Sequence, residues 1–341
     1  MIYHPIRVVH YGLGSIGSNI ARLMATQRGL QIVGGIDNDP QKVGRDLGEV
    51  IGLNHPLDAP VLADADELLA QTKPDIIIHA TTSFLHEVYS QLRVCIQAGA
   101  NVISTCEELV YPYATARVPA EELNRIAHLR GVTVVGAGVN PGFIMDVLPL
   151  FMTAPCINVR RISVTRMVDA TTRTASLQQR IGAGLTIDQF RHHLAKGTVR
   201  HVGLHESLQM IADNLGWRLD QITEAIEPIT ATDWIQTSCL TVAPGQVAGI
   251  HQFVQGWLHR RDVIALTWQT TVGARDTHDA IMIDGTPPID LVIRGGLHGD
   301  QATAGIILHV LPHVIAAPPG LTTVSSLPIM HFQPRPEPTI F

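Results

Sequence analysis

Residues 6–25 read IRVVHYGLGSIGSNIARLMA. A short apolar run leads directly into the pattern G-x-G-x-x-G at Gly12, Gly14 and Gly17, and apolar residues at helical spacing follow it. A strand, a glycine-rich turn and a helix in this order are typical of the first unit of a dinucleotide-binding sheet. The stretch therefore predicts an α/β chain whose first domain has a Rossmann-type, doubly wound parallel sheet.

The same loop indicates where a cofactor binds. Glycines permit a tight turn and a close approach of the backbone, and the free N–H groups at a helix start favour the negative charge of a pyrophosphate. We therefore assign cofactor binding to the residues of this loop, which are Gly12, Gly14, Ser15, Ile16 and Gly17.

Asp37 follows the second apolar run, LQIVGGI, and lies 20 residues after Gly17. An acidic group at this place accepts hydrogen bonds from the adenine ribose hydroxyls and repels a 2′-phosphate, so NAD is favoured over NADP. Asn38, Lys42 and Arg45 follow closely, so NADP stays open as an alternative cofactor.

The periodicity divides the chain into domains. Apolar runs such as PDIIIHATT alternate with helical stretches, which predicts a dinucleotide-binding domain at 1–140. Later runs such as VIALTWQTTVG alternate apolar with polar residues, which predicts a second α+β domain at 141–299, built on a largely antiparallel sheet. We expect this domain to bind substrate and to form a dimer, and to contain a helical stretch at about 187–224. Residues 300–341 are expected to form a C-terminal helix and an extended tail, QPRPEPTIF, that return to the first domain.

Composition limits the class of protein. The 341 residues suffice for about two domains. The formal net charge of -6 argues against nucleic acid as a partner, and no apolar run approaches the about 20 residues of a membrane span. Neither a signal-peptide pattern nor a C-x-x-C spacing is found, and the histidine pairs lack a regular helix, so we expect a cytoplasmic enzyme without a metal site.

Residues that end the apolar runs are the next candidates, because ligands of such a sheet lie over the carboxyl ends of its strands. Thr81, Thr82 and Ser83 are predicted to line the nicotinamide ribose, or to cap the following helix, and the two roles are compatible. Cys106 ends the fifth run and is also assigned to cofactor binding. The sixth run leads to the loop that contains Asn140.

Five stretches together carry a resemblance that covers nearly the whole chain: GLGSIGSNIARL, STCEELVYP, GVNPGFIMD, HVGLHES and GDQATAG. The sequence resembles the 2,4-diaminopentanoate dehydrogenases and the related native amine dehydrogenases, and its first domain is similar to dihydrodipicolinate reductase. The resemblance implies reversible, NAD(P)-dependent oxidative deamination of a primary amine, or reductive amination of a small ketone or aldehyde with ammonia. It also implies that one glutamate of C-E-E-L is catalytic.

We assign the catalytic role to Glu108, with Glu107 as the alternative. Glu108 stands where the sugar dehydrogenases related to glucose-fructose oxidoreductase, with their similar H-V-x-C-E-K-P stretch, have a lysine. Amine oxidation develops an iminium cation, which a carboxylate stabilises better than an ammonium group does. The glutamate is expected to act first as a general base toward ammonia and then as a general acid.

Substrate contacts are matched to the resemblance only in part. Asn140, His201 and Thr303 are expected near the substrate, and Phe143 and Met145 of the predicted helix NPGFIMDVLPLFM form an apolar wall or ordinary core.

Two arginines of the first strand of the second domain complete the predicted contacts. Arg161 and Arg166 bind a substrate carboxylate or pair with neighbouring acids. Two other functions remain as alternatives: a true 2,4-diaminopentanoate dehydrogenase, and a non-catalytic NAD(H)-binding redox sensor. A homodimer formed through the exposed face of the second sheet is expected by analogy of fold.

Overall fold

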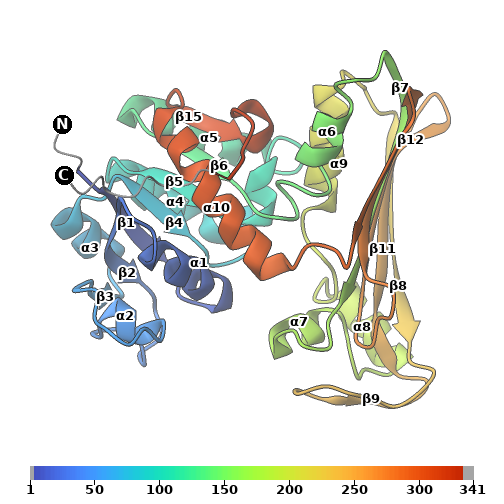
Figure 1. Cartoon of the computed structure of the whole chain (residues 1–341), viewed down its shortest axis with the longest axis horizontal. Helices are drawn as coiled ribbons and strands as arrows, with labels where there is room; N and C mark the ends of the chain where they lie inside the picture. The colour runs from blue at the N-terminus through green and yellow to red at the C-terminus, as the bar shows by residue number, and fades with distance from the viewer. Residues whose placement is uncertain (1–3, 333–341) are drawn as a thin grey trace, which may run out of the picture. The chain divides into compact units, whose positions relative to one another are not determined.

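The computed structural model describes residues 4–332, which form two compact units. One unit comprises the residues up to Gly142 together with those from His298 onward, and the other runs from Phe143 to Leu297. Each unit is built on its own sheet (Figure 1). The predicted tail at residues 333–341 lies outside the described residues.

The first unit contains a seven-stranded sheet in the order β15-β6-β5-β4-β1-β2-β3, and neighbouring strands pair in parallel. The strands are β1 (Ile6–Tyr11), β2 (Leu30–Ile36), β3 (Val61–Leu62), β4 (Ile76–His79), β5 (Asn101–Ser104), β6 (Thr133–Gly136) and β15 (Gly320–Thr323). Strands β4 and β6 are buried along their whole length, which is why they read as continuous apolar runs. The predicted Rossmann-type parallel sheet is confirmed.

Helices cover both faces of this sheet. They are α1 (Ser15–Ala25), α2 (Leu47–Val50), α3 (Ala65–Thr72), α4 (Leu85–Gln97), the 3₁₀ helix η1 (Glu107–Val110), α5 (Arg117–Arg130), α10 (Gly299–Ala316) and the 3₁₀ helix η2 (Val324–Ser326). Helices α3, α4 and α5 form one layer, while α10 packs on α1 and on strands β5 and β6 (Figure 1).

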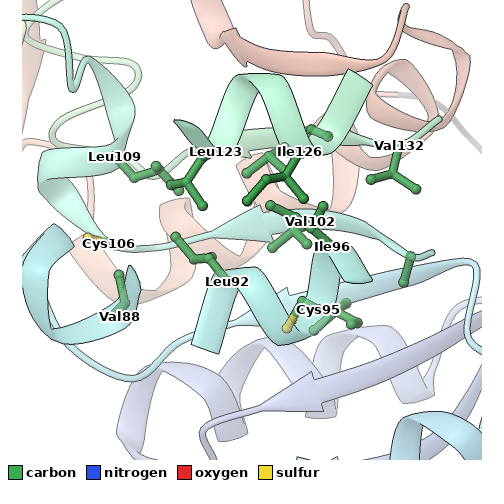
Figure 2. Close-up of a cluster of buried hydrophobic side chains, with 14 of the residues drawn as sticks. Val88, Leu92, Cys95, Ile96, Val102, Cys106, Leu109, Leu123, Ile126 and Val132 are labelled. Carbon is green, nitrogen blue, oxygen red and sulfur yellow. The ribbon is translucent and has the colours of Figure 1, made fainter. Parts of the chain in front are cut away.

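The core between the sheet, α4 and α5 holds a loop that matters for the site. Figure 2 shows Val88 and Leu92 of α4 and Leu123 of α5 closing around the segment after β5, in which Cys106 and Leu109 are fully buried. Burying an aliphatic side chain of this size contributes about 1.5–3 kcal/mol. Glu107 and Glu108, which lie between these two buried residues, are therefore held in place on both sides, although their own side chains are only partly buried.

The second unit contains a six-stranded sheet in the order β14-β13-β7-β12-β11-β8, which is antiparallel except where β7 pairs with β12. Its strands are β7 (Asn158–Asp169), β8 (Gln221–Thr230), β11 (Val247–Leu258), β12 (Arg261–Thr271), β13 (His278–Thr286) and β14 (Ile289–Arg294), and a separate ribbon pairs β9 (Ile235–Gln236) with β10 (Thr241–Val242). The helices are α6 (Val147–Met152), α7 (Ala175–Arg180), α8 (Ile187–Ala195) and α9 (Leu204–Asn214), of which α9 packs on β11 and β12. The prediction of a largely antiparallel sheet is confirmed.

Two predicted helices were wrong in extent. The stretch 187–224 is broken into α8 and α9 because Gly197 and Gly203 adopt φ values of 71° and 110°, and β8 occupies its last residues. In NPGFIMDVLPLFM the helix begins only at Val147, because Asp146 accepts the N–H of Val147 at 2.6 Å and Gly142 has a φ of 113°.

Candidate active site

The glycine loop has room for a ligand where the pattern predicts it. A Cβ on Gly12 would lie 2.4 Å from the carbonyl oxygen of Ala80, and a Cβ on Gly17 would lie 2.0 Å from that of Gly12. Around Gly14, by contrast, no atom of residues 4–332 lies within 4 Å of an added Cβ, apart from its chain neighbours and the backbone of its own helix. Gly14 is also the N-cap of α1 and offers no side chain to its first N–H groups. Close packing of the backbone thus requires glycine at positions 12 and 17. Gly14 instead leaves open space at the start of α1.

Ser15 and Ile16 form the first turn of α1, with Ser15 exposed and Ile16 half-buried. No acidic side chain lies in this turn. The residues present therefore fit a pyrophosphate, which needs free N–H groups and no competing negative charge.

Asp37, directly after β2, ties that loop to the neighbouring strand. One carboxylate oxygen accepts the N–H of Leu13 at 2.8 Å and the ammonium of Lys42 at 3.1 Å, and the other accepts the N–H of Asp39 at 2.9 Å. Burial alone raises the pKa of Asp37, but the bonds from Asp39, Leu13 and Lys42 outweigh it and hold this pKa below its ordinary value. The carboxylate is therefore ionised and its charge is partly balanced by Lys42.

The loops after β4 and β5 are joined at Ser83. Its carbonyl oxygen accepts the N–H of Glu108 at 3.3 Å and the thiol of Cys106, whose Sγ lies 3.1 Å away. Burial, together with the negative charges of Glu107 and Glu108, raises the pKa of the Cys106 thiol. Cys106 therefore keeps its proton, and its contribution to this loop is a hydrogen bond.

Glu108 also holds the start of α4. Its Oε2 accepts the N–H of Leu85, the first residue of α4, at 2.7 Å. The N-cap residue, Phe84, has no acceptor side chain, which is the one signal in the sequence that a cap must come from elsewhere. The alternative prediction that Thr81, Thr82 or Ser83 caps this helix was wrong, since Thr82 instead donates to the side chain of Glu87.

The loop after β6 carries two further predicted residues. Thr303, buried near the start of α10, accepts the N–H of Val139 at 3.2 Å through its hydroxyl. Asn140 follows Val139 in this loop and is half-buried. Asn140 and Thr303 therefore belong to one contact region of the first unit, at the carboxyl end of β6.

In the second unit, His201 stacks on Trp268, with ring centroids 4.4 Å apart and planes inclined by 23°. Gln252 accepts the N–H of His201 at 2.8 Å and donates to its carbonyl oxygen at 2.9 Å. Burial, with the positive charges of Arg180, Arg166 and Arg200 nearby, lowers the pKa of His201 to about 3. The imidazole is neutral, and sequence reasoning missed the contacts of His201 with Trp268 and Gln252.

The two arginines of β7 lie on opposite faces of the sheet. Arg166 is 3% exposed, pairs with Asp279 at 3.0 Å and donates to the carbonyl oxygen of Leu297 at 2.6 Å. Arg161 pairs with Asp262 at 2.8 Å on the other face, beside Ser163. The structure therefore brings Arg166, and not Arg161, to the face on which Trp268 packs.

The remaining predicted substrate residues precede α6. Phe143 is half-buried and Met145 is fully buried. Among residues 4–332, no group of three or more His, Cys, Asp or Glu side chains is arranged to hold a metal ion. The same range contains no helix long and apolar enough to span a membrane.

Comparison with known proteins places this geometry in a family. Residues 143–333, more than half of the chain, match the model of the 2,4-diaminopentanoate dehydrogenase C-terminal domain. The chain belongs to the 2,4-diaminopentanoate dehydrogenase family. Residues 6–106 match a second model, that of the dihydrodipicolinate reductase N-terminus. The predicted resemblance is confirmed, and so is the prediction of an oxidoreductase.

Full-length relatives agree with this membership of the 2,4-diaminopentanoate dehydrogenase family. A 2,4-diaminopentanoate dehydrogenase of Acetoanaerobium sticklandii is 30% identical over 95% of this chain and 94% of its own length. An amine dehydrogenase of Streptomyces virginiae is 24% identical over 95% and 96%. The solved structure of an amine dehydrogenase from Mycobacterium smegmatis superposes with a TM-score of 0.87 at 28% identity, covering 96% of this chain and 97% of that one. The chain is thus an amine-related dehydrogenase of NAD(P)-binding type.

Proposed function

We propose that this protein is an NAD(P)-dependent amine dehydrogenase that interconverts a primary amine with a small ketone or aldehyde plus ammonia. The observation that carries the proposal is the carboxylate of Glu108, held by the N–H of Leu85 at the carboxyl ends of β4 and β5. That edge is where the ligands of a Rossmann-type sheet bind. The names of the full-length relatives support the same class of substrate.

The cofactor is proposed to bind along this edge. The glycine loop from Gly12 to Gly17 would hold the pyrophosphate, and Asp37 the adenine ribose. Thr81, Thr82, Ser83 and Cys106 lie at the ends of β4 and β5 and would face the nicotinamide half. NAD is the preferred cofactor because of Asp37, while Lys42 offers a cation to the additional phosphate of NADP.

Glu108 supplies the proton transfers in the direction of amine formation. The carboxylate accepts a proton from ammonium, the ammonia that this leaves adds to the carbonyl carbon, and a proton passes from nitrogen to oxygen to give the neutral carbinolamine. The same carboxyl group then protonates the hydroxyl of the carbinolamine, which leaves as water, and the ionised carboxylate stabilises the iminium cation. When bound, NADH or NADPH would supply the hydride that reduces this cation. Glu107 is the alternative for the same role.

The proposed substrate contacts are Asn140 and Thr303 within the first unit, and Phe143 and His201 within the second. Phe143 is half-buried and offers apolar surface that excludes bulk water, which strengthens the attraction between a carboxylate and an iminium, whereas Met145 is fully buried and belongs to the core. His201 is neutral and stacked, so it offers a hydrogen-bonding group without a competing positive charge.

A true 2,4-diaminopentanoate dehydrogenase is the second candidate. It is favoured by the relative from Acetoanaerobium sticklandii and by the positive charge of Arg180 near His201, which suits a substrate carboxylate, whereas Arg166 is already paired with Asp279. Arg161 is bound to Asp262 on the other face of β7 and does not support such a site.

A coupled assay tests the proposal and separates the two enzymes. The amine dehydrogenase consumes NADH with cyclohexanone or a short aldehyde plus ammonia, whereas the diaminopentanoate dehydrogenase forms NADH from the diamino acid. A redox sensor, the candidate from another class, would bind NADH but turn over neither substrate, and Glu108→Ala would leave its cofactor binding unchanged. The names of the full-length relatives, which are dehydrogenases, argue against the sensor.

A homodimer through the open face of the second sheet is also proposed. A row of small or uncharged side chains crosses this face, and in the single chain its first member is exposed and the others are only partly buried: Val292, Ala280, Thr165, Thr267, Phe253 and Ala225. Such a row packs well against a second copy of itself. Size-exclusion chromatography with light scattering should give twice the mass of one chain for the unchanged protein. The variant Thr267→Arg should give the mass of one chain.

A further inference from the structure

We propose that His79 is a positioning residue: as a neutral imidazole at the end of β4, it orients the Cys106–Glu108 turn and Thr81 through hydrogen bonds to Ser104 and Gln91. This inference rests on the proposed amine dehydrogenase function, because the group that it positions is the catalytic carboxylate.

The imidazole is held from three sides within the first unit. His79 is fully buried, and its register partner on β5 is Ser104. Nδ1 lies 2.9 Å from the hydroxyl of Ser104, and Nε2 lies 2.7 Å from the side-chain oxygen of Gln91 on α4. Tyr11 of β1 meets the ring edge to face, with centroids 5.3 Å apart. The ring therefore has one defined position between two strands and a helix.

The partners also fix the tautomer. The side-chain oxygen of Gln91 can only accept, so Nε2 of His79 carries the ring hydrogen and donates it to Gln91. Nδ1 is then an acceptor, and the hydroxyl of Ser104 donates to it while its oxygen accepts the N–H of Cys106 at 3.1 Å. Burial lowers the pKa of His79 to about 4, so the ring is neutral near pH 7 and keeps this single tautomer.

This chain of bonds ends at the proposed catalytic loop. Ser104 holds the N–H of Cys106, the residue that opens the turn with Glu107 and Glu108. Gln91 accepts the hydroxyl of Thr81 at 2.8 Å and belongs to α4, whose first N–H binds the carboxylate of Glu108. Both anchors of Glu108, the turn and the helix start, are thus tied to one imidazole.

The glycine loop has a separate anchor, because Asp37 binds the N–H of Leu13. Removal of the imidazole should therefore disturb the carboxylate more than it disturbs the binding of NADH. Misplacing a catalytic group by about 1 Å can cost about a hundredfold in rate.

The decisive variant is His79→Phe, which keeps a buried aromatic ring and removes the hydrogen bonds of the imidazole to Ser104, Gln91 and Thr81. His10→Phe is the matched control, since His10 is equally buried on the adjacent strand β1 and neither of its ring nitrogens has a hydrogen-bond partner among residues 4–332. We expect kcat to fall about tenfold or more in His79→Phe while the dissociation constant of NADH changes by less than about threefold. We expect His10→Phe to retain the kcat of the unchanged chain.

His79→Asn and Ser104→Ala separate positioning from a general loss of packing. An asparagine amide can replace Nδ1, so His79→Asn should recover kcat relative to His79→Phe by restoring the bond to Ser104. Ser104→Ala keeps the imidazole but breaks its link to Cys106, and should lose kcat as His79→Phe does. Should His79→Phe not fold, Ser104→Ala decides in its place.

The outcomes distinguish this inference from the proposed function. If the unchanged chain turns over amine and His79→Phe or Ser104→Ala keeps full kcat, the positioning role is overturned and the function stands. Equal losses in His79→Phe and His10→Phe would overturn it as well. If the unchanged chain binds NADH but turns over no amine or carbonyl substrate, the proposed function fails and this inference fails with it.

Discussion

The carboxylate of Glu108 and the backbone N–H of Leu85 form a hydrogen bond of 2.7 Å between residues 23 positions apart in the chain. The bond satisfies a free N–H at the start of α4, and it also fixes the direction of the carboxylate. These two contributions can be separated experimentally, because a glutamine side chain keeps an acceptor oxygen for Leu85 but carries no charge.

We therefore expect Glu108→Gln to lower kcat for reductive amination by about 10²–10⁴-fold, because a general base is lost, with little change in the thermal midpoint. Glu108→Ala should in addition lose the bond to Leu85, at a cost of about 1 kcal/mol in the free energy of unfolding. Steady-state rates and thermal denaturation provide both readouts. Glu107→Gln is the matched control. A large loss of kcat in Glu107→Gln together with full activity of Glu108→Gln would transfer the catalytic role to Glu107.

Two glycine substitutions should separate folding from cofactor binding. Gly12→Ala places a Cβ 2.4 Å from the oxygen of Ala80 at a φ of 92°, so it should cost about 1–3 kcal/mol of stability as well as NADH affinity. Gly14→Ala meets no atom within 4 Å and should keep the stability of the fold, but its methyl group occupies the space assigned to the pyrophosphate. Denaturant unfolding and NADH fluorescence titration measure the two effects. Unchanged NADH affinity in Gly14→Ala would contradict this assignment.

The first sheet and its glycine loop could be predicted because their signals are local in sequence. A strand, a G-x-G-x-x-G turn and an amphipathic helix lie within residues 6–25, and the apolar runs mark the other strands. The bond between Glu108 and Leu85 could not be predicted, since it depends on β4 and β5 lying side by side in register. The one sequence signal for this bond is that Phe84, the N-cap residue of α4, has no side chain that can accept a hydrogen bond.

In the second unit, too, contacts between residues distant in sequence could not be predicted. Alternation along β7 predicts that Arg161 and Arg166 point to opposite faces, but it does not say which face receives the helices. The break between α8 and α9, by contrast, had a visible signal in Gly197 and Gly203, whose left-handed φ values end and begin helices. Periodicity therefore identified the elements, and contacts distant in sequence decided the positions of their side chains.

Lys42 should influence the choice between the two cofactors. Its ammonium lies 3.1 Å from Asp37 and 3.6 Å from Asp39, so it can turn toward a 2′-phosphate bound beside Asp37. Lys42→Ala should weaken NADPH binding about tenfold or more, since a hydrogen bond to a charged group contributes about 1.5–3 kcal/mol, and should leave NADH binding nearly unchanged. Arg45→Ala is the control, because Arg45 pairs with Glu49 at 2.6 Å on the surface. Equal losses for both cofactors in Lys42→Ala would contradict this role.

Stability in weak acid should depend on the buried imidazoles of the chain. Burial lowers the pKa of His10 to about 3 and that of His79 to about 4, from an ordinary value of 6.5. Below pH 6.5 the unfolded chain takes up protons that the folded chain refuses, so the free energy of unfolding should fall by up to about 1.4 kcal/mol per pH unit for each such group. His10→Phe removes one of these imidazoles. The free energy of unfolding of this variant should therefore fall less steeply between about pH 6 and pH 4, by the contribution of one proton. Urea unfolding at a series of pH values measures the slope. Equal slopes for His10→Phe and the unchanged chain would mean that His10 is protonated in the folded state, which its full burial without a hydrogen-bond partner argues against.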